Sequence, residues 1–266
     1  MFEALLRAKR KDDGEIIPPS RNFEGLKFKK NTMRLICFLS AFLFFINFSF
    51  AQFAKIVDKD RFVNVRSGAD AKSKIIGQIK SNEIVYIFNG DDFDEWQIVD
   101  YATKNDRLLT GYVHHSRIKL LSTYEQIPSV FTTENEAEFT LRNIDVKIKT
   151  ADFDYEKNKQ NFKTVQYEKY AVQQYKNQEV WGIDGTIPKT NYQSITIKID
   201  GKTIEIPAKE MENLFNPNAE NSECYYDEKN KKLFIISMNA DGAGSYEILF
   251  TIENGKYRGR SVYLAN

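Results

Sequence analysis

Apolar residues along most of this chain recur at every second position in short runs, which is the spacing of β-strands whose two faces differ. Between residues 55 and 121 there are five such runs, at 62–65, 75–76, 83–88, 96–99 and 110–113. Turn-forming residues, such as those at 67–68, 81–82 and 89–92, fill the gaps between them. Five short strands in so short a segment predict a small barrel, over 52–123.

A second β-rich region is predicted over 131–266, after a linker at 124–130. Asp200-Gly201 and Asn254-Gly255 each separate two alternating runs, and these dipeptides favour the primed turns of β-hairpins. The predicted hairpins pair 194–199 with 202–206, 223–226 with 233–238, and 246–252 with the segment from 257. A strand is also predicted at 139–149, with Ile144, Val146 and Ile148 on one face, and one short helix is predicted at 208–215. The fold class expected is therefore mainly β, with a small barrel followed by an antiparallel β-rich domain.

One long apolar run, at 35–50, breaks the strand pattern. It follows Arg34 and ends at Ala51, with Ser49 two residues earlier, which is typical of a secretory signal peptide and its cleavage site. We predict a signal peptide at 33–51 that is cleaved after Ala51. An uncleaved membrane anchor is the alternative, but the run is shorter than the ~20 apolar residues that a span needs. No stable membrane span is expected after cleavage.

The segment before the apolar run, residues 1–32, carries scattered charges and no hydrophobic period. It is predicted to be an unstructured upstream extension, with translation beginning at Met33. The 51 leading residues hold nine of the 38 basic and five of the 37 acidic residues, which leaves 29 against 32. This balance provides no basic surface of the kind that nucleic-acid binding requires.

The exported chain keeps one of the two cysteines, because Cys37 lies in the apolar run and only Cys224 follows it. An internal disulfide is then excluded. Cys224 is predicted to be a strand residue, with pairing between chains as the alternative.

The barrel region resembles a known family, the bacterial SH3 domain, through motifs in matching order and spacing. These are Asn64-Val65-Arg66-Ser67-Gly68, Ile75-Ile76-Gly77, Lys80-Ser-Asn82-Glu83, Trp96 and Gly111-Tyr112-Val113. Asn82 stands where the family usually has Gly, which is compatible because Asn also adopts left-handed conformations. Ala69 replaces a common Pro, and an insertion at 101–109 lengthens one hairpin.

The resemblance implies a recognition module that faces the cell envelope, where such domains bind cell-wall peptides or act as spacers. A small barrel has too little interior for a deep pocket, so recognition would use exposed side chains. The candidate ligand-binding residues are Arg66, Asp70, Trp96 and Tyr112. The alternative is that Val65 and Trp96 fill the core while Asn64 and Arg66 secure the turn.

Two loops rich in Gly and Asp interrupt the strand pattern of the second region, at 181–188 and 239–245. They would form a second site if they converged, with Asp184 and Asp241 as polar anchors; otherwise their glycines simply turn the chain. The many tyrosines of this region would form a sugar-stacking face or pack within the sheets.

The chain has only two histidines, His114 and His115, and both precede the second region. Cysteine peptidases, zinc amidases and most serine hydrolases need histidine, so these classes are disfavoured. Neighbouring strand residues point to opposite faces, so the two histidines cannot hold one metal ion together. We expect no metal and no cofactor. Carboxylate-based glycan hydrolysis stays open, with Asp184, Asp241 or Glu247.

Together these features predict a periplasmic or secreted, non-enzymatic binding protein of the cell envelope. The expected partner is a cell-wall peptide or an envelope protein. One alternative is an inhibitor or immunity-like protein that blocks a wall-degrading enzyme; the other is a carboxylate-based glycan hydrolase.

Overall fold

A computed structural model of the chain describes residues 52–87, 95–102, 108–166 and 171–265. The described residues belong to one compact unit. The predicted upstream extension, signal peptide and cleavage site lie outside the described residues, as do the predicted turn at 89–92, Tyr167 and Tyr170. Within the described part, no helix is long and apolar enough to cross a membrane.

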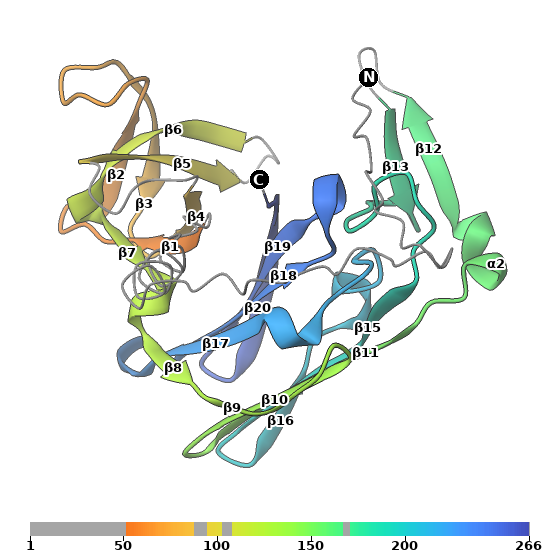
Figure 1. Ribbon diagram of the computed structural model, residues 1–266. Helices are drawn as coiled ribbons and strands as arrows, with labels where there is room; N and C mark the ends of the chain where they lie inside the picture. The colour runs from red at the N-terminus through yellow and green to blue at the C-terminus, as the bar shows by residue number, and fades with distance from the viewer. Residues whose placement is uncertain (1–51, 88–94, 103–107, 167–170, 266) are drawn as a thin grey trace, which may run out of the picture. The chain divides into compact units, whose positions relative to one another are not determined.

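The described residues form antiparallel sheets with little helix, so the prediction of a mainly β fold is confirmed. The N-terminal sheet has seven strands in the order β3-β2-β6-β5-β4-β1-β7 (Figure 1). Its strands are β1 (Gln52–Ile56), β2 (Phe62–Arg66), β3 (Ile75–Lys80), β4 (Ile84–Ile87), β5 (Trp96–Ala102), β6 (Leu108–His114) and β7 (Ile118–Leu120).

The N-terminal sheet is not a closed barrel among the described residues, because its outermost strands, β3 and β7, do not pair with each other. The sheet nevertheless encloses one core, since Ala54, Val65, Ile79, Val99 and Val113 from five different strands pack in a single cluster. The prediction of a small barrel is therefore not confirmed, because the described strands form an open sheet around one core. The strand β7 has only three residues, and it pairs with β1 at the other end of the sheet.

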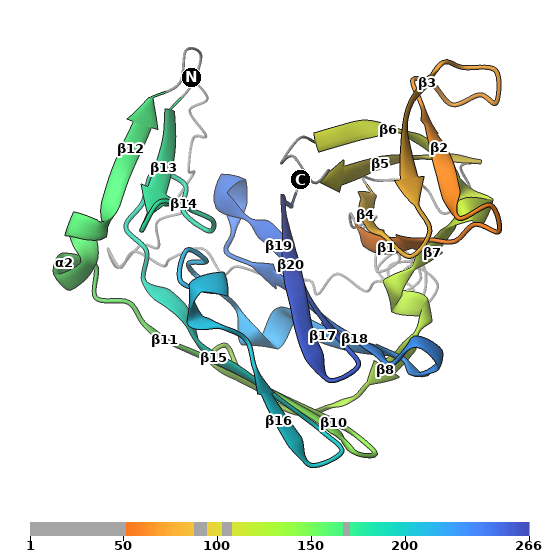
Figure 2. The same ribbon diagram turned by 180° about the vertical axis from the view of Figure 1, so that it is seen from behind.

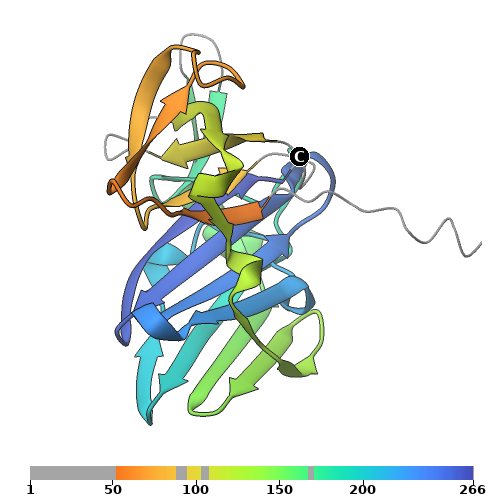
Figure 3. The ribbon, with the colours of Figure 1, turned by 90° about the vertical axis from the view of Figure 1, so that its left-hand side faces the viewer.

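The second region contains two five-stranded sheets. The second sheet, in the order β16-β15-β11-β10-β9, comprises β9 (Ser129–Thr132), β10 (Glu136–Leu141), β11 (Ile144–Asp152), β15 (Thr190–Ile199) and β16 (Lys202–Glu205). The C-terminal sheet, in the order β20-β19-β18-β17-β8, comprises β8 (Glu125–Ile127), β17 (Ser222–Asp227), β18 (Lys232–Asn239), β19 (Tyr246–Glu253) and β20 (Lys256–Leu264). The blue strands of the C-terminal sheet lie side by side in Figure 3.

A small three-stranded sheet and short helical turns complete the fold. Figure 2 shows the small sheet, formed by β12 (Phe162–Gln166), β13 (Ala171–Tyr175) and β14 (Gln178–Glu179). The helix α2 spans Tyr155–Asn158. The 3₁₀ turns are η1 (His115–Arg117), η2 (Leu121–Thr123), η3 (Lys159–Asn161), η4 (Ala208–Glu210), η5 (Ala219–Asn221), η6 (Glu228–Asn230) and η7 (Gly242–Gly244).

All three predicted hairpins are confirmed, as β15–β16, β17–β18 and β19–β20. The strand predicted at 139–149 is wrong, because Arg142 has φ of 54° and turns the chain between β10 and β11. Ile144, Val146 and Ile148 do share one buried face, on β11. Residues 125–127, within the predicted linker, form β8 and pair with β17.

The helix predicted at 208–215 is also wrong, since only the three-residue turn η4 forms there. Tertiary pairing replaces the later helical turns. Leu214 forms a β-bridge with Trp181, and Phe215 forms another with Asn191. Asn213 donates a side-chain hydrogen bond to the Glu179 carbonyl.

The C-terminal sheet is buried on both faces. Ile235 and Ile248 lie on one face and pack in a large core that includes Ile148 and Ile197 of the second sheet. Leu249, on the opposite face, packs in a different cluster. The members of that cluster come from the C-terminal sheet and from the N-terminal region: Phe53, Tyr86, Leu121, Tyr225, Phe234 and Leu249.

A buried ion pair joins the same two regions. The Lys55 ammonium lies 2.8 Å from the Asp227 carboxylate, and each side chain is only 5% exposed. Burial lowers the pKa of Lys55, but hydrogen bonds to Asp227 and Tyr124 outweigh it and raise that pKa overall. Burial raises the pKa of Asp227, but hydrogen bonds from Lys55 and Asn230 outweigh it and lower that pKa overall. Both groups are thus charged in the folded protein.

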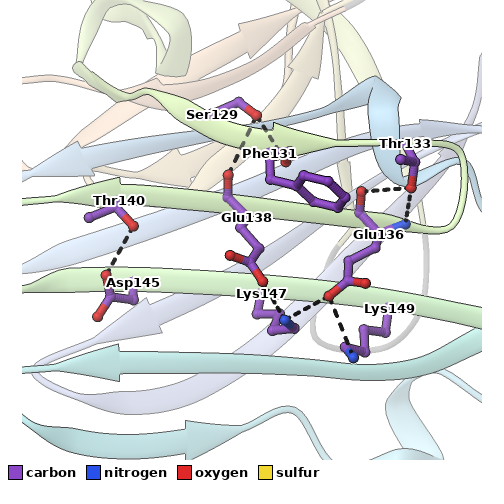
Figure 4. Close-up of polar contacts among 9 residues, drawn as sticks. All are labelled: Ser129, Phe131, Thr133, Glu136, Glu138, Thr140, Asp145, Lys147 and Lys149. Atoms are coloured by element: carbon purple, nitrogen blue, oxygen red, sulfur yellow. Dashed lines mark hydrogen bonds and ion pairs between the residues drawn. The ribbon is translucent and has the colours of Figure 1, made fainter.

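The outward face of the second sheet is polar and pairs its own charges (Figure 4). Lys147 contacts both Glu136, at 2.6 Å, and Glu138, and Lys149 lies 3.5 Å from Glu136. Because acidic side chains of β10 stand opposite basic side chains of β11, the charges cancel locally. This face therefore has the character of a solvated surface.

Candidate binding groove on the N-terminal sheet

The register of the N-terminal sheet places polar and aromatic side chains on its outward face. On β2, Val63 and Val65 are buried, so the alternate residues Phe62, Asn64 and Arg66 face outward. On β6, Val113 is buried. Pairing of Arg66 with Tyr112, and of Trp96 with His114, then brings β2, β6 and β5 together on this face.

A groove of about 430 Å³ lies on this surface, next to the turns that follow β1 and β6. Its lining residues are Asp58, Asp60, Phe62, Val63, Asn64, Arg66, Ala71, Trp96, Val113, His114, Ser116 and Arg117. The groove thus combines aromatic rings with groups of both charges.

Trp96 lies half-buried at the groove and not in the core. Its ring meets the His114 ring edge to face, with centroids 5.3 Å apart. His114 is held in turn by the Ser116 hydroxyl at 2.8 Å and the Glu95 carboxylate at 3.2 Å. Of the two residues assigned to the core in the alternative interpretation, Val65 is fully buried there and Trp96 is not.

The charged residues of the groove are fixed by local hydrogen bonds. The Arg66 guanidinium donates a hydrogen bond to the carbonyl of Ser73 at 2.8 Å. Arg66 therefore secures the turn and also lines the groove. Arg117 lies 2.9 Å from the Asp58 carboxylate, and Asp58 also accepts the backbone N–H of Asp60 at 2.7 Å. A preorganised surface of this kind loses little side-chain freedom when a ligand binds.

The other candidates of this region lie beside the groove. Tyr112 is half-buried on β6 next to Arg66 but does not line the groove. Asp70 is exposed, and its carboxylate accepts the backbone N–H of Lys72 at 3.0 Å, so it stabilises the turn between β2 and β3. The left-handed conformation expected for Asn82 is confirmed, with φ of 71°.

The two Gly-Asp loops do meet. A Cβ built on Gly244 would lie 3.1 Å from the carbonyl carbon of Ile183 and 3.2 Å from the backbone nitrogen of Asp184, so the loops are in direct contact there. Asp184 and Asp241 are both exposed. Three cavities lined by described residues contain neither of them.

The tyrosines of the second region contribute mainly to packing. Those at 175, 192, 225 and 246 are buried. Cys224 is fully buried too, and burial raises the pKa of its thiol. Among the residues that the structure describes, no three His, Cys, Asp or Glu side chains are grouped so that they could hold a metal ion.

Sequence reasoning did not select Phe62, Asp58 or His114, although all three line the groove. For Phe62, the signal available in the sequence was an aromatic residue two positions before Asn64, where the family-like motif begins. The position of His114 depends on its pairing with Trp96, which the sequence does not reveal. No protein-family model matches the chain, and neither the curated proteins nor the solved structures provide a match.

Proposed function

We propose that this protein is an exported, non-enzymatic binding protein of the cell envelope, and that the groove on its N-terminal sheet holds a cell-wall peptide. The observation that carries the proposal is the groove itself, where Trp96 and Phe62 stand beside Arg66 and Asp60. Aromatic rings provide contact area at low entropic cost, and groups of both charges suit a peptide that has both amines and carboxylates.

Two sequence features support this proposal independently of the groove. The motifs around Asn64–Gly68 and Gly111–Val113 resemble bacterial SH3 domains, whose ligands include wall peptides. The apolar run at 35–50 with a small residue at its end is typical of an export signal. The outward face of the N-terminal sheet, which carries the groove, would be the surface that meets the ligand.

The test is retention of the exported full chain on purified peptidoglycan. Trp96→Ala and Phe62→Ala should each weaken binding at least about tenfold, because aromatic side chains that a ligand covers commonly dominate an interface. Phe131→Ala is the matched control, since Phe131 is an exposed aromatic on β9 outside the groove. Equal retention of all three variants, or no retention of the unaltered chain, would refute the proposed ligand.

Export is tested separately. Fractionation followed by N-terminal sequencing should find a chain that begins at Gln52 in the envelope or the medium. An intact peptide across residues 50–53 in the exported protein would contradict cleavage.

A further inference from the structure

A second cavity, of about 640 Å³, lies where β1 and the turn η2 meet the C-terminal sheet. It shares no lining residue with the groove described above. Its lining residues are Gln52, Phe53, Ser122, Gln126, Ile127, Ser129, Phe139, Glu220, Asn221, Ser222, Glu223, Tyr225, Ile236, Met238 and Glu247. A cavity of this size can hold a small molecule or a long side chain.

Glu247 is the unusual member of this lining. It lies on β19 and is only 8% exposed, in a strand whose other residues up to Phe250 are all buried and uncharged. Its Oε2 atom has no hydrogen-bond partner among the described residues. A buried carboxylate with one unpaired oxygen is costly, so such a group is rare unless a ligand or a proton neutralises it.

The lining is acidic without any basic residue. It contains three carboxylates, those of Glu220, Glu223 and Glu247, and no lysine, arginine or histidine. Tyr225 donates a hydrogen bond to Glu223 at 2.7 Å and so holds the Glu223 carboxylate in place. Half of the remaining lining residues are apolar or aromatic, with Phe53 and Met238 among them, and the other half are uncharged polar residues.

We propose that this cavity binds a small organic cation, an ammonium or guanidinium group on a hydrocarbon chain. The cation lies against Glu247, which supplies the unpaired oxygen, and Glu223 provides a second acceptor nearer the solvent. The hydrocarbon chain packs on Phe53 and Met238. Such a ligand would satisfy the Glu247 carboxylate and fill apolar space at the same time.

The protonation of Glu247 agrees with this assignment. Burial chiefly raises the pKa of Glu247, to about 7; a hydrogen bond from Tyr86 lowers this pKa, and the charge of Glu223 raises it. A bound cation would favour the ionised carboxylate and lower this pKa again.

Two sources share the chemistry of the cation: a free amine, or the side chain of a lysine or arginine in a partner protein. Calorimetric titration of the exported full chain at pH 8 with n-hexylamine tests the first, with n-hexanol and hexanoate as neutral and anionic controls. Titration with a lysine-containing peptide and the same peptide with norleucine tests the second. Preference for the free amine or for the lysine peptide identifies the source.

We expect hexylamine or the lysine peptide to bind at least tenfold more tightly than its uncharged control. Glu247→Gln should abolish this preference, because it keeps the shape of the side chain and removes its charge. Glu223→Gln, at the exposed end, should weaken binding about threefold. Glu205→Gln on β16 is the matched control and should change nothing, since Glu205 is exposed and outside the cavity.

The thermal unfolding of each variant is measured alongside to confirm that it folds. Equal binding of cation and uncharged control, or an unchanged preference in Glu247→Gln, would overturn the proposal. Absence of binding by both cations at millimolar concentration would overturn it as well. None of these results would affect the peptide groove, which the Trp96 and Phe62 variants test separately.

Discussion

Replacing Glu247 by Gln should stabilise the protein at neutral and alkaline pH but not at acidic pH. The Glu247 side chain is buried, and its pKa is about 7 in the folded state against an ordinary value of 4.5. Between these two pH values the folded protein binds a proton that the unfolded chain has already released, so folding becomes less favourable as the pH rises. Gln cannot ionise and therefore removes this dependence.

The magnitude follows from the difference between the two pKa values. At about 1.4 kcal/mol per pKa unit, the cost of ionising Glu247 reaches about 3 kcal/mol once the pH exceeds 7. The free energy of unfolding of Glu247→Gln should thus equal that of the unaltered chain near pH 4.5 and exceed it by up to about 3 kcal/mol at pH 8. Other groups around this site, namely Tyr86, Asp100, Glu223 and Tyr263, are common to both proteins and largely cancel in the comparison.

Urea denaturation of both proteins at several pH values between 4.5 and 8.5 measures the difference directly. Glu205→Gln serves as the control, because an exposed carboxyl should give a difference that does not vary with pH. If the gain from Glu247→Gln is the same at pH 5 and pH 8, the assignment of a buried carboxyl with a raised pKa is wrong.

Three further predictions concern the packing of the described residues. Lys55→Met should lower the free energy of unfolding by about 3–5 kcal/mol, because it leaves the buried Asp227 carboxylate without its counter-ion. A loss below about 1 kcal/mol in urea denaturation would contradict this prediction. Gly182→Ala should lower the free energy of unfolding by at least about 2 kcal/mol, since φ is 85° and the added Cβ would collide with the backbone carbonyl of Phe215. Gly185→Ala, where φ is 62° and the added Cβ meets open space, should lower it by about 1 kcal/mol. Equal melting temperatures for these two variants would refute the collision. Cys224 should not react with a thiol reagent at pH 8 until the protein is unfolded, because the residue is buried and burial raises its pKa; mass spectrometry of digested, labelled protein identifies the modified cysteine.

The regular parts of the fold follow from local sequence. Asp200-Gly201 and Asn254-Gly255 specify their hairpins because the residues that adopt positive φ stand next to each other in the chain. The two wrong predictions, the single strand at 139–149 and the helix at 208–215, were based on local preferences that the folded chain does not follow. Alternation alone did not reveal the turn at Arg142, and the helical pattern at 208–215 gave way to bridges with Trp181 and Asn191.

For the candidate sites, the sequence by itself determined which chemistry is available, and the tertiary structure decided which residues meet. Composition and motifs identified Trp96 and Arg66 as candidates, and both line the groove. Glu247 interrupts an otherwise apolar stretch of β19, but nothing in the local sequence shows that its side chain lines a cavity. Its burial and its unpaired oxygen arise only when β1, η2 and the C-terminal sheet pack together, because desolvation depends on neighbours distant in sequence.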